Sequence, residues 1–167
     1  MGMSPLRVAL TAVASAFLQA PLAAMLGWQD VRQRYRRSSL GPFWLTLSMG
    51  VMIGAIGLVF GQVFNAPMAE FLPFLATGLV LWGLISTTVT EGCQSFVGAE
   101  GIIKQLPIPL FVHVLRMLWR NFIIFFHNLI IVPVVFLVVG KPVDWVALLA
   151  LPGLLVLSLN LAWVSLL

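Results

Sequence analysis

The sequence predicts an all-α integral membrane protein, with an N-terminal interfacial helix followed by four transmembrane helices. Charged residues make up 8% of the 167 residues and hydrophobic residues 61%, whereas an ordinary soluble domain carries about 25% charged residues. Nine basic and five acidic side chains cannot cover the surface of a soluble protein of this length. Long uncharged runs recur along the chain, and most basic residues stand beside them. A soluble fold is therefore not expected.

The uncharged runs set the boundaries of the predicted transmembrane domain. A spanning helix needs about 20 mostly apolar residues, and four segments after residue 39 fit that length. We expect the domain to cover residues 40–167, with spans at about 40–64, 71–90, 111–139 and 145–167. Asn65, Ala66 and Pro67 should end the first span.

Residues 1–39 are predicted to form a cytoplasmic segment that contains an interfacial amphipathic helix. The uncharged run at 8–29 is long enough to span a membrane, but it contains several polar residues and the interior Pro21. We therefore expect it to lie on the cytoplasmic face of the membrane. A fifth span is the alternative, because the run lacks the charged face that interfacial helices usually carry.

A basic cluster fixes the predicted orientation. It consists of Arg32, Arg34, Arg36 and Arg37, with Tyr35 between them. Lys and Arg beside spanning helices stay on the cytoplasmic side, so the N-terminus is predicted to be cytoplasmic. Of the basic residues assigned to loops, six then face the cytoplasm and only Lys141 faces outward. The net charge of +4 is explained by these loops, and no nucleic-acid partner is expected.

The sequence contains no enzyme motif that we recognise. There is no G-x-x-x-x-G-K-[ST] phosphate loop, no G-x-G-x-x-G, no H-E-x-x-H and no G-x-S-x-G. The two histidines, His113 and His127, stand fourteen positions apart, and Cys93 is the single cysteine. We expect no catalytic residue, no metal site and no cofactor bound by this chain.

Four glycines share one face of the first predicted span. Gly50, Gly54, Gly57 and Gly61 fall at i, i+4, i+7 and i+11 and include two G-x-x-x-G units. Glycine lets neighbouring helices approach closely in lipid. The face therefore predicts helix packing, either within the chain or against another subunit or a pore wall.

A polar stripe marks the third predicted span. His113, Arg116, Arg120 and His127 fall within an arc of about 60° on a helix. Charged residues deep in a bilayer face a bundle interior or water, so the stripe predicts a path for an anionic or phosphate-bearing substrate. The alternative places Arg116 and Arg120 at the cytoplasmic boundary, with the membrane part of the helix starting near Asn121.

The stretch at 91–109 predicts a contact site for a cytoplasmic partner between the second and third spans. Glu91 and Glu100 could cap helix N-termini, and Lys104 stands late in the stretch, as the helix dipole favours. Pro107 and Pro109 then break the chain. A short helix parallel to the membrane fits this pattern, and a plain connecting loop is the alternative.

Two segments resemble the permease subunits of polysaccharide-export ABC transporters, a family that exports O-antigen, capsule and teichoic acid chains. Residues 30–44 read Asp-Val-Arg-Gln-Arg-Tyr-Arg-Arg-Ser-Ser-Leu-Gly-Pro-Phe-Trp and resemble the segment before the family's first span. Residues 101–109 read Gly-Ile-Ile-Lys-Gln-Leu-Pro-Ile-Pro and resemble the family's cytoplasmic connection before the third span. The resemblance runs from about Leu26 to the C-terminal residue.

The resemblance implies a subunit that moves lipid-linked polysaccharide, such as the O-antigen of lipopolysaccharide, across the bacterial inner membrane. It implies six spans, a homodimer, and separate ATP-binding cassette ATPase subunits that bind the ATP. Their contact would fall on the stretch that holds Glu91, Glu100 and Lys104. Because four spans are predicted here, we expect an N-terminal fragment that cannot export on its own.

Two other functions stay open. One is an ABC permease for a different cargo, such as a drug or a small lipid. The other is a membrane-embedded enzyme of the acyltransferase type that uses His113 or His127. The lack of a partnered carboxylate near either histidine in the sequence argues against that second alternative.

Overall fold

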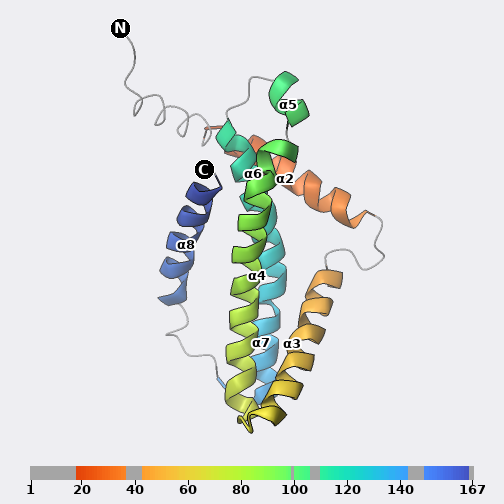
Figure 1. Cartoon of the computed structure of the whole chain (residues 1–167), viewed down its shortest axis with the longest axis vertical. Helices are drawn as coiled ribbons and strands as arrows, with labels where there is room; N and C mark the ends of the chain where they lie inside the picture. Colours follow the sequence, from red (N-terminus) through yellow and green to blue (C-terminus); the bar gives the residue numbers. More distant parts are fainter. Residues whose placement is uncertain (1–17, 37–42, 99, 106–109, 143–148, 166–167) are drawn as a thin grey trace.

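The protein is all-helical in a computed structural model, which describes residues 18–36, 43–98, 100–105, 110–142 and 149–165 (Figure 1). The described helices are α2 (Ala20–Tyr35), α3 (Phe43–Val63), α4 (Met68–Gly98), α5 (Glu100–Gln105), α6 (Leu110–Leu129), α7 (Ile131–Val139) and α8 (Ala150–Val164). The chain runs up and down through α3, α4 and the pair α6–α7, while α2 crosses this bundle at one end (Figure 1).

Three helical stretches are long and apolar enough to cross a membrane. They are Phe43–Val63, Met68–Gln94 and Phe111–Val139. Helix α8 is also apolar, but its 15 residues extend only about 22 Å at 1.5 Å per residue, less than the roughly 30 Å of a hydrocarbon core. Parts of the predicted fourth span at 145–167 lie outside the described residues, so that span stays a prediction.

The turn between α3 and α4 follows from a left-handed asparagine. Asn65 has a φ of 49°, a conformation that Asn adopts more readily than most residues. The N–H of Ala66 donates to the carbonyl of Gly61 at 3.1 Å, a bond typical of a helix that ends in a left-handed residue. Helix α3 accordingly ends at Val63, where the sequence predicts its end.

The third apolar stretch is interrupted at Ile130, between α6 and α7. Pro133 has no N–H to donate to the carbonyl of Leu129. Ile130 nevertheless keeps helical angles, φ −58° and ψ −28°, so α7 continues close to the direction of α6 (Figure 1). Gly140, with a φ of 73°, ends α7, and the N–H of Lys141 donates to the carbonyl of Phe136 at 3.1 Å.

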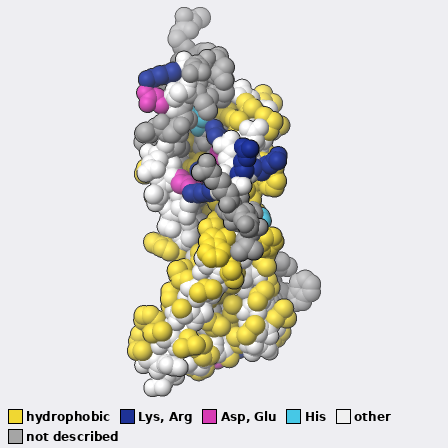
Figure 2. Space-filling view, turned by 90° about the vertical axis from the view of Figure 1, so that its right-hand side faces the viewer, with side chains coloured by type: hydrophobic (Ala, Val, Ile, Leu, Met, Phe, Trp, Pro, Cys, Tyr) yellow, Lys and Arg dark blue, Asp and Glu magenta, His cyan; other side chains and the backbone are white. Residues whose placement is uncertain are grey.

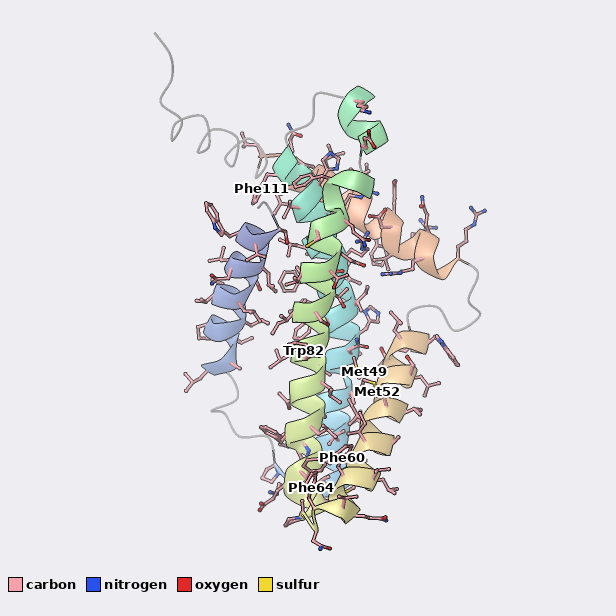
Figure 3. The ribbon with its side chains drawn as sticks, viewed as in Figure 1. Met49, Met52, Phe60, Phe64, Trp82 and Phe111 are labelled. Carbon is pink, nitrogen blue, oxygen red and sulfur yellow. The ribbon has the colours of Figure 1, made fainter. Side chains whose placement is uncertain are left out.

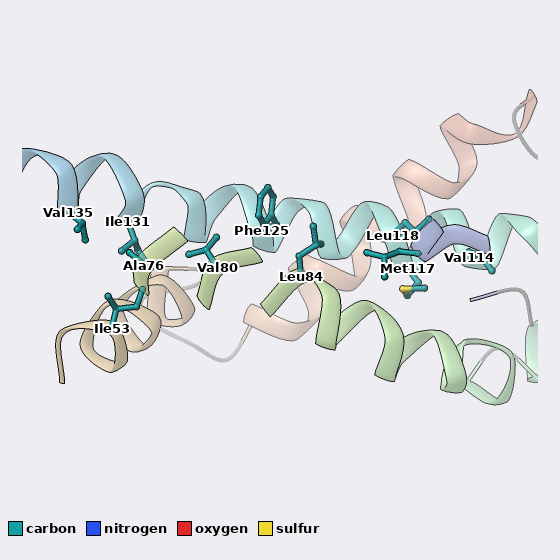
Figure 4. Close-up of a cluster of buried hydrophobic side chains, with 11 residues drawn as sticks. Ile53, Ala76, Val80, Leu84, Val114, Met117, Leu118, Phe125, Ile131 and Val135 are labelled. Atoms are coloured by element: carbon teal, nitrogen blue, oxygen red, sulfur yellow. The ribbon is translucent and has the colours of Figure 1, made fainter. Parts of the chain in front are cut away.

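The hydrophobic core lies where α4 packs against α6, α7 and α3 (Figure 4). Its buried members are Ile53, Ala76, Val80, Leu84, Val114, Met117, Leu118, Phe125, Ile131, Val135 and Leu161. Large apolar side chains also cover the outside: Trp82 is 64% exposed and Leu137 is 80% exposed. A helix bundle that is apolar both inside and outside is suited to lipid rather than to water.

Charged side chains gather toward one end of the bundle (Figure 2). We call this the charged end: it contains α2, α5, the end of α4 and the beginning of α6. The opposite end, which holds the α3–α4 turn and Gly140, is called the turn end. Among the described residues there, Lys141 and Glu70 form a loose ion pair, with their N and O atoms 3.8 Å apart.

Two helices extend further than the uncharged runs indicate. Helix α2 continues through Arg32 and Arg34 to Tyr35, which basic side chains near a helix C-terminus favour. Residues 1–17 lie outside the described residues, so the first part of the run at 8–29 is not placed. Helix α4 continues through Glu91 to Gly98, since a glutamate ends an uncharged run but favours a helix.

Candidate functional site

The charged end contains a cluster of ion pairs between α2, α4 and α6. Arg116 on α6 holds Asp30 on α2 with two hydrogen bonds, from Nε to Oδ2 at 2.7 Å and from Nη2 to Oδ1 at 2.5 Å. Arg120, one turn along, donates to Asp30 Oδ2 at 3.2 Å. The Asp30 side chain is only 13% exposed, so this carboxylate is largely enclosed by the two guanidinium groups.

Arg120 extends the cluster to α4. Its Nη2 donates to Glu91 Oε2 at 2.7 Å, while Arg34 on α2 lies 3.5 Å from Glu91 Oε1. Arg120 therefore bridges carboxylates from two helices. Bidentate and shared contacts of this kind orient side chains firmly. We call Asp30, Arg34, Glu91, Arg116 and Arg120 the ion-pair cluster.

Matching spacings bring these residues together. Arg116 and Arg120 are four residues apart on α6, and Asp30 and Arg34 are four residues apart on α2, so each pair shares a helix face. Gly27 lets the two helices approach: a Cβ atom there would lie 2.9 Å from the carbonyl oxygen of Arg116. Helix α2 is thus seated directly against the backbone of α6.

The cluster keeps an excess of positive charge. Three arginines face two carboxylates, which leaves one positive charge without a matching carboxylate in the cluster. The Nε of Arg120 is buried and has no hydrogen-bond partner among the described residues. Arg34 has the longest contact and the most exposed side chain of the three, at 53%. The excess charge is therefore most available at Arg34.

The structure divides the predicted polar stripe of α6. Arg116 and Arg120 belong to the ion-pair cluster, but His113 and His127 do not contribute to it. His113 is only 3% exposed, and neither of its ring nitrogens has a partner among the described residues. His127 Nδ1 lies 2.7 Å from the carbonyl oxygen of Ile123. Its ring and that of Phe43 form a T-shaped pair, with their centroids 6.2 Å apart.

The predicted docking residues are also separated. Glu91 lies inside α4, so the expectation that it caps a helix N-terminus is wrong. Glutamate favours a helix interior, and its carboxylate there binds Arg120. Glu100 and Lys104 lie on the short helix α5, in its first and last turns, as the dipole argument predicts. They pair with each other at 2.5 Å on an exposed surface. Pro107 and Pro109 lie outside the described residues.

The basic cluster of α2 has two faces. Arg34 points toward Glu91, whereas Arg32 and Arg36 are exposed and line a shallow groove with Gln29 and Gln33. Arg37 and the side chain of Tyr35 lie outside what the structure describes.

The four predicted packing glycines fall into two pairs. Gly57 and Gly61 are buried where α3 contacts α4, and a Cβ atom on either would overlap the side chain of Leu72 or Met68. Gly50 and Gly54 have open space around them. The first pair packs within the chain. Of the second pair, Gly50 lines an apolar groove with Leu47 and Ile131, and Gly54 is exposed on α3.

A cavity with mostly apolar walls and a few polar groups lies beside the ion-pair cluster, between α3, α4 and α6. It has a volume of about 480 Å³, and Arg34 stands at its charged end. Met49 and Met52 lie on the side of α3 that faces this space (Figure 3). Asn121 and Asn128 on α6 also line it. Their side-chain oxygens are buried and accept no hydrogen bond from the described residues.

The residues that sequence reasoning missed are Asp30 and Asn121. Asp30 carried a usable signal, because it is one of only five acidic residues and stands four positions before Arg34. Asn121 appeared only as the start of the membrane part of its helix. In the described ranges, no three His, Cys, Asp or Glu side chains group closely enough to hold a metal ion.

Comparison with known proteins indicates a transport role. A segment of 81 residues, 48% of this chain, is 27% identical to the O-antigen export system permease protein RfbA of Klebsiella pneumoniae. The match covers 31% of that protein's length. No protein-family model and no solved structure match the chain. Together with the three apolar helices, the likeness supports a membrane transport subunit rather than an enzyme.

Proposed function

We propose that the chain is part of the permease subunit of an ABC exporter that moves lipid-linked polysaccharide, such as O-antigen or capsule, across the bacterial inner membrane. The observation that carries this proposal is the likeness to an O-antigen export permease. The basic and Leu-Gly-Pro-x-Trp segment at 30–44 supports it, because it is the segment by which the sequence resembles such permeases.

The proposed partners are two ATP-binding cassette ATPase subunits and a second permease copy. The sequence has no phosphate-binding loop, so ATP would be hydrolysed on the partner. Helix α5 offers a place for contact: Glu100 and Lys104 are 61% and 72% exposed at the charged end. Gly50 and Gly54, which have no described atom within 4 Å of an added Cβ, suit contact with a helix of a second copy.

The arrangement of charges supports a cytoplasmic charged end. Arg32, Arg34 and Arg36 lie there together with Lys104, whereas the turn end carries Lys141 among the described basic residues. The positive-inside rule assigns the richer end to the cytoplasm. The proposed location is the inner membrane, with several spans and a cytoplasmic N-terminus.

Export of a drug or a small lipid is the second candidate function. The cavity between α3, α4 and α6 favours it, because a volume of about 480 Å³ is in the size range of small-molecule sites. An acyltransferase gains no support from the structure, since the described contacts of His113 and His127 include no carboxylate.

Deletion of the gene in its native host tests the proposal. If the protein exports polysaccharide, the surface polysaccharide should be largely lost, because its route across the membrane is removed. Lipid-linked polysaccharide should accumulate inside the cell. Resupply of the whole gene is the control and should restore both. Unchanged surface polysaccharide, with no internal accumulation, would rule out this cargo and favour the second candidate.

A further inference from the structure

The cavity between α3, α4 and α6 is formed by divergence of α3 from its neighbours. At the turn end, Gly57 and Gly61 bring α3 against α4. Toward the charged end, α3 separates from α4 and α6 (Figure 1), and a space of about 480 Å³ opens between the three helices. The walls are mostly apolar, with Leu45, Met49, Leu84 and Phe125 among them. Such walls suit a hydrocarbon chain.

Two buried acceptors inside the cavity receive no hydrogen bond from the part of the chain that the structure describes. Asn121 is 3% exposed, and its Nδ2 donates to Thr88 Oγ1 and to the acceptor Met117 Sδ, both at 3.3 Å. Its Oδ1 has no hydrogen-bond partner among the described residues. Asn128, two helical turns further in, has a buried Oδ1 without a partner among the described residues. Buried acceptors are nearly always hydrogen-bonded in folded proteins. An occupant with a hydroxyl or amide N–H would satisfy them.

The charged end of the cavity favours an anion. Arg34 lines it there, and the ion-pair cluster behind Arg34 has one positive charge in excess. Arg34 is held by Glu91 at 3.5 Å only, while Glu91 already binds Arg120 at 2.7 Å. A phosphate at this position would neutralise the excess charge and gain charge-assisted hydrogen bonds.

We propose that this cavity binds an anionic amphiphile in which a hydrogen-bond donor lies between a phosphate group and one hydrocarbon chain. The phosphate binds Arg34, the donor binds Asn121 Oδ1, and the chain lies along the apolar walls. Ordinary diacyl phospholipids do not fit this order of groups, because the atoms next to their phosphate are ester oxygens, which only accept hydrogen bonds. A lysophospholipid has a free hydroxyl there, and an N-acylated phospholipid has an amide N–H.

The proposal does not depend on the exported cargo. It concerns a site within one chain, and the binding experiment does not measure export. Export of polysaccharide and occupancy of this cavity can therefore fail separately.

Binding of matched lipids to the full chain in phosphatidylcholine nanodiscs tests the proposal, with native mass spectrometry as the readout. Palmitoyl lysophosphatidic acid should bind about tenfold more tightly than its deoxy analogue, which lacks the free hydroxyl. N-palmitoylethanolamine phosphate distinguishes the source of the donor: tight binding would show that an amide N–H serves as well as a hydroxyl. Equal affinities for the hydroxyl and deoxy lipids, or no binding of either, would overturn the proposal.

Variants assign the contacts. Asn121→Leu should remove the preference for the hydroxyl lipid, while Asn160→Leu, on the exposed face of α8, should keep it. Arg34→Gln should weaken both lipids about threefold to tenfold, and Arg34→Lys should restore part of the loss. Arg36→Gln, outside the cavity lining, is the matched control. A preference that survives in Asn121→Leu would overturn the proposed contact.

A filled cavity provides an independent check if Asn121→Leu folds poorly. Gly83 lines the cavity, and a Cβ atom there would meet only Met49 Cε, at 3.4 Å. Gly83→Leu should preserve the helix, since leucine favours helices over glycine, and it should abolish binding of both lipids. Undiminished binding in this variant would place the lipids elsewhere on the protein.

Discussion

The two ends of the bundle are held together by different interactions. At the turn end, α3 and α4 are joined by a short turn, and Gly57 and Gly61 allow close packing between sequence neighbours. At the charged end, Asp30 contacts Arg116 and Arg120 across 86 and 90 residues. Glu91 and Arg120 are 29 residues apart. The turn end depends on local geometry, and the charged end depends on charge pairing between distant segments.

This difference determines which end tolerates change. The Glu70–Lys141 pair of the turn end is loose and exposed, and exposed pairs contribute about 0–1 kcal/mol. Asp30 of the charged end is largely enclosed, so loss of its charge leaves Arg116 without its carboxylate partner and Arg120 with Glu91 alone. The charged end is also where α2, the helix that crosses the bundle, is attached. Structural sensitivity should therefore concentrate there.

The largest expected contrast between the ends is their side of the membrane. Fusions after Pro67 and Pro142, both at the turn end, should place the reporter in the periplasm. A fusion after Glu100, at the charged end, should place the reporter in the cytoplasm. Fusions to alkaline phosphatase and to green fluorescent protein at each position give complementary signals and serve as mutual controls. A cytoplasmic signal at Pro67 would contradict the proposed orientation.

Removal of one charge should lower the free energy of unfolding much more at the charged end than at the turn end. Asp30→Asn is expected to lower the free energy of unfolding by about 3 kcal/mol, at the low end of the range for breaking an enclosed ion pair. Glu70→Gln is the matched control at the turn end and should change it by less than about 0.5 kcal/mol. Thermal unfolding in detergent measures both. Similar losses in the two variants would show that the ion-pair cluster does not hold α2.

Much of the fold could be predicted from the sequence, because spanning helices follow from long apolar runs. The end of α3 was equally predictable, since Asn65 and Pro67 are local signals for a helix end. The extension of α4 past Glu91 was not, because a charge at that position ends an apolar run without ending a helix. Glutamate is itself a good helix former, so the end of an apolar run is a poor guide to the end of the helix.

The candidate site was predicted only in part. The spacing of Arg116 and Arg120 correctly placed them on one helix face, but their partners come from α2 and α4. Helix crossing decides those contacts, and periodicity carries no information about crossing. The same limit applies to the glycine face, where the sequence treats Gly54 and Gly57 alike. Only the divergence of α3 makes one of them open and the other buried.

Replacing a glycine by alanine should have different effects on stability where α2 crosses α6 and on the exposed face of α3. Gly27→Ala is expected to cost about 1–3 kcal/mol of unfolding free energy, because the new Cβ would lie 2.9 Å from the backbone oxygen of Arg116. That oxygen belongs to a helix backbone and cannot rotate away. Gly54→Ala has nothing within 4 Å and should be neutral or stabilising by up to about 1 kcal/mol.

Chemical unfolding of the two alanine variants in the same detergent gives this comparison. Equal stability would mean that α2 is not seated against α6. If Gly54→Leu instead lowers self-association while single-chain stability stays constant, the open glycine face contacts another copy.

The smallest expected change in stability comes from reversal of the two charges on α5. In Glu100→Lys/Lys104→Glu the pair stays four residues apart, so the cost should be only about 0.5 kcal/mol, from the less favourable order of charges along the helix. Membrane insertion should be unchanged. Association with the ATPase partner should nevertheless fall, because exposed charges guide docking between proteins. Co-purification of the ATPase with the double variant measures this, and Glu70→Lys/Lys141→Glu at the turn end is the matched control. Wild-type co-purification in the α5 variant would move the contact to another surface of the charged end, with α2 as the next candidate.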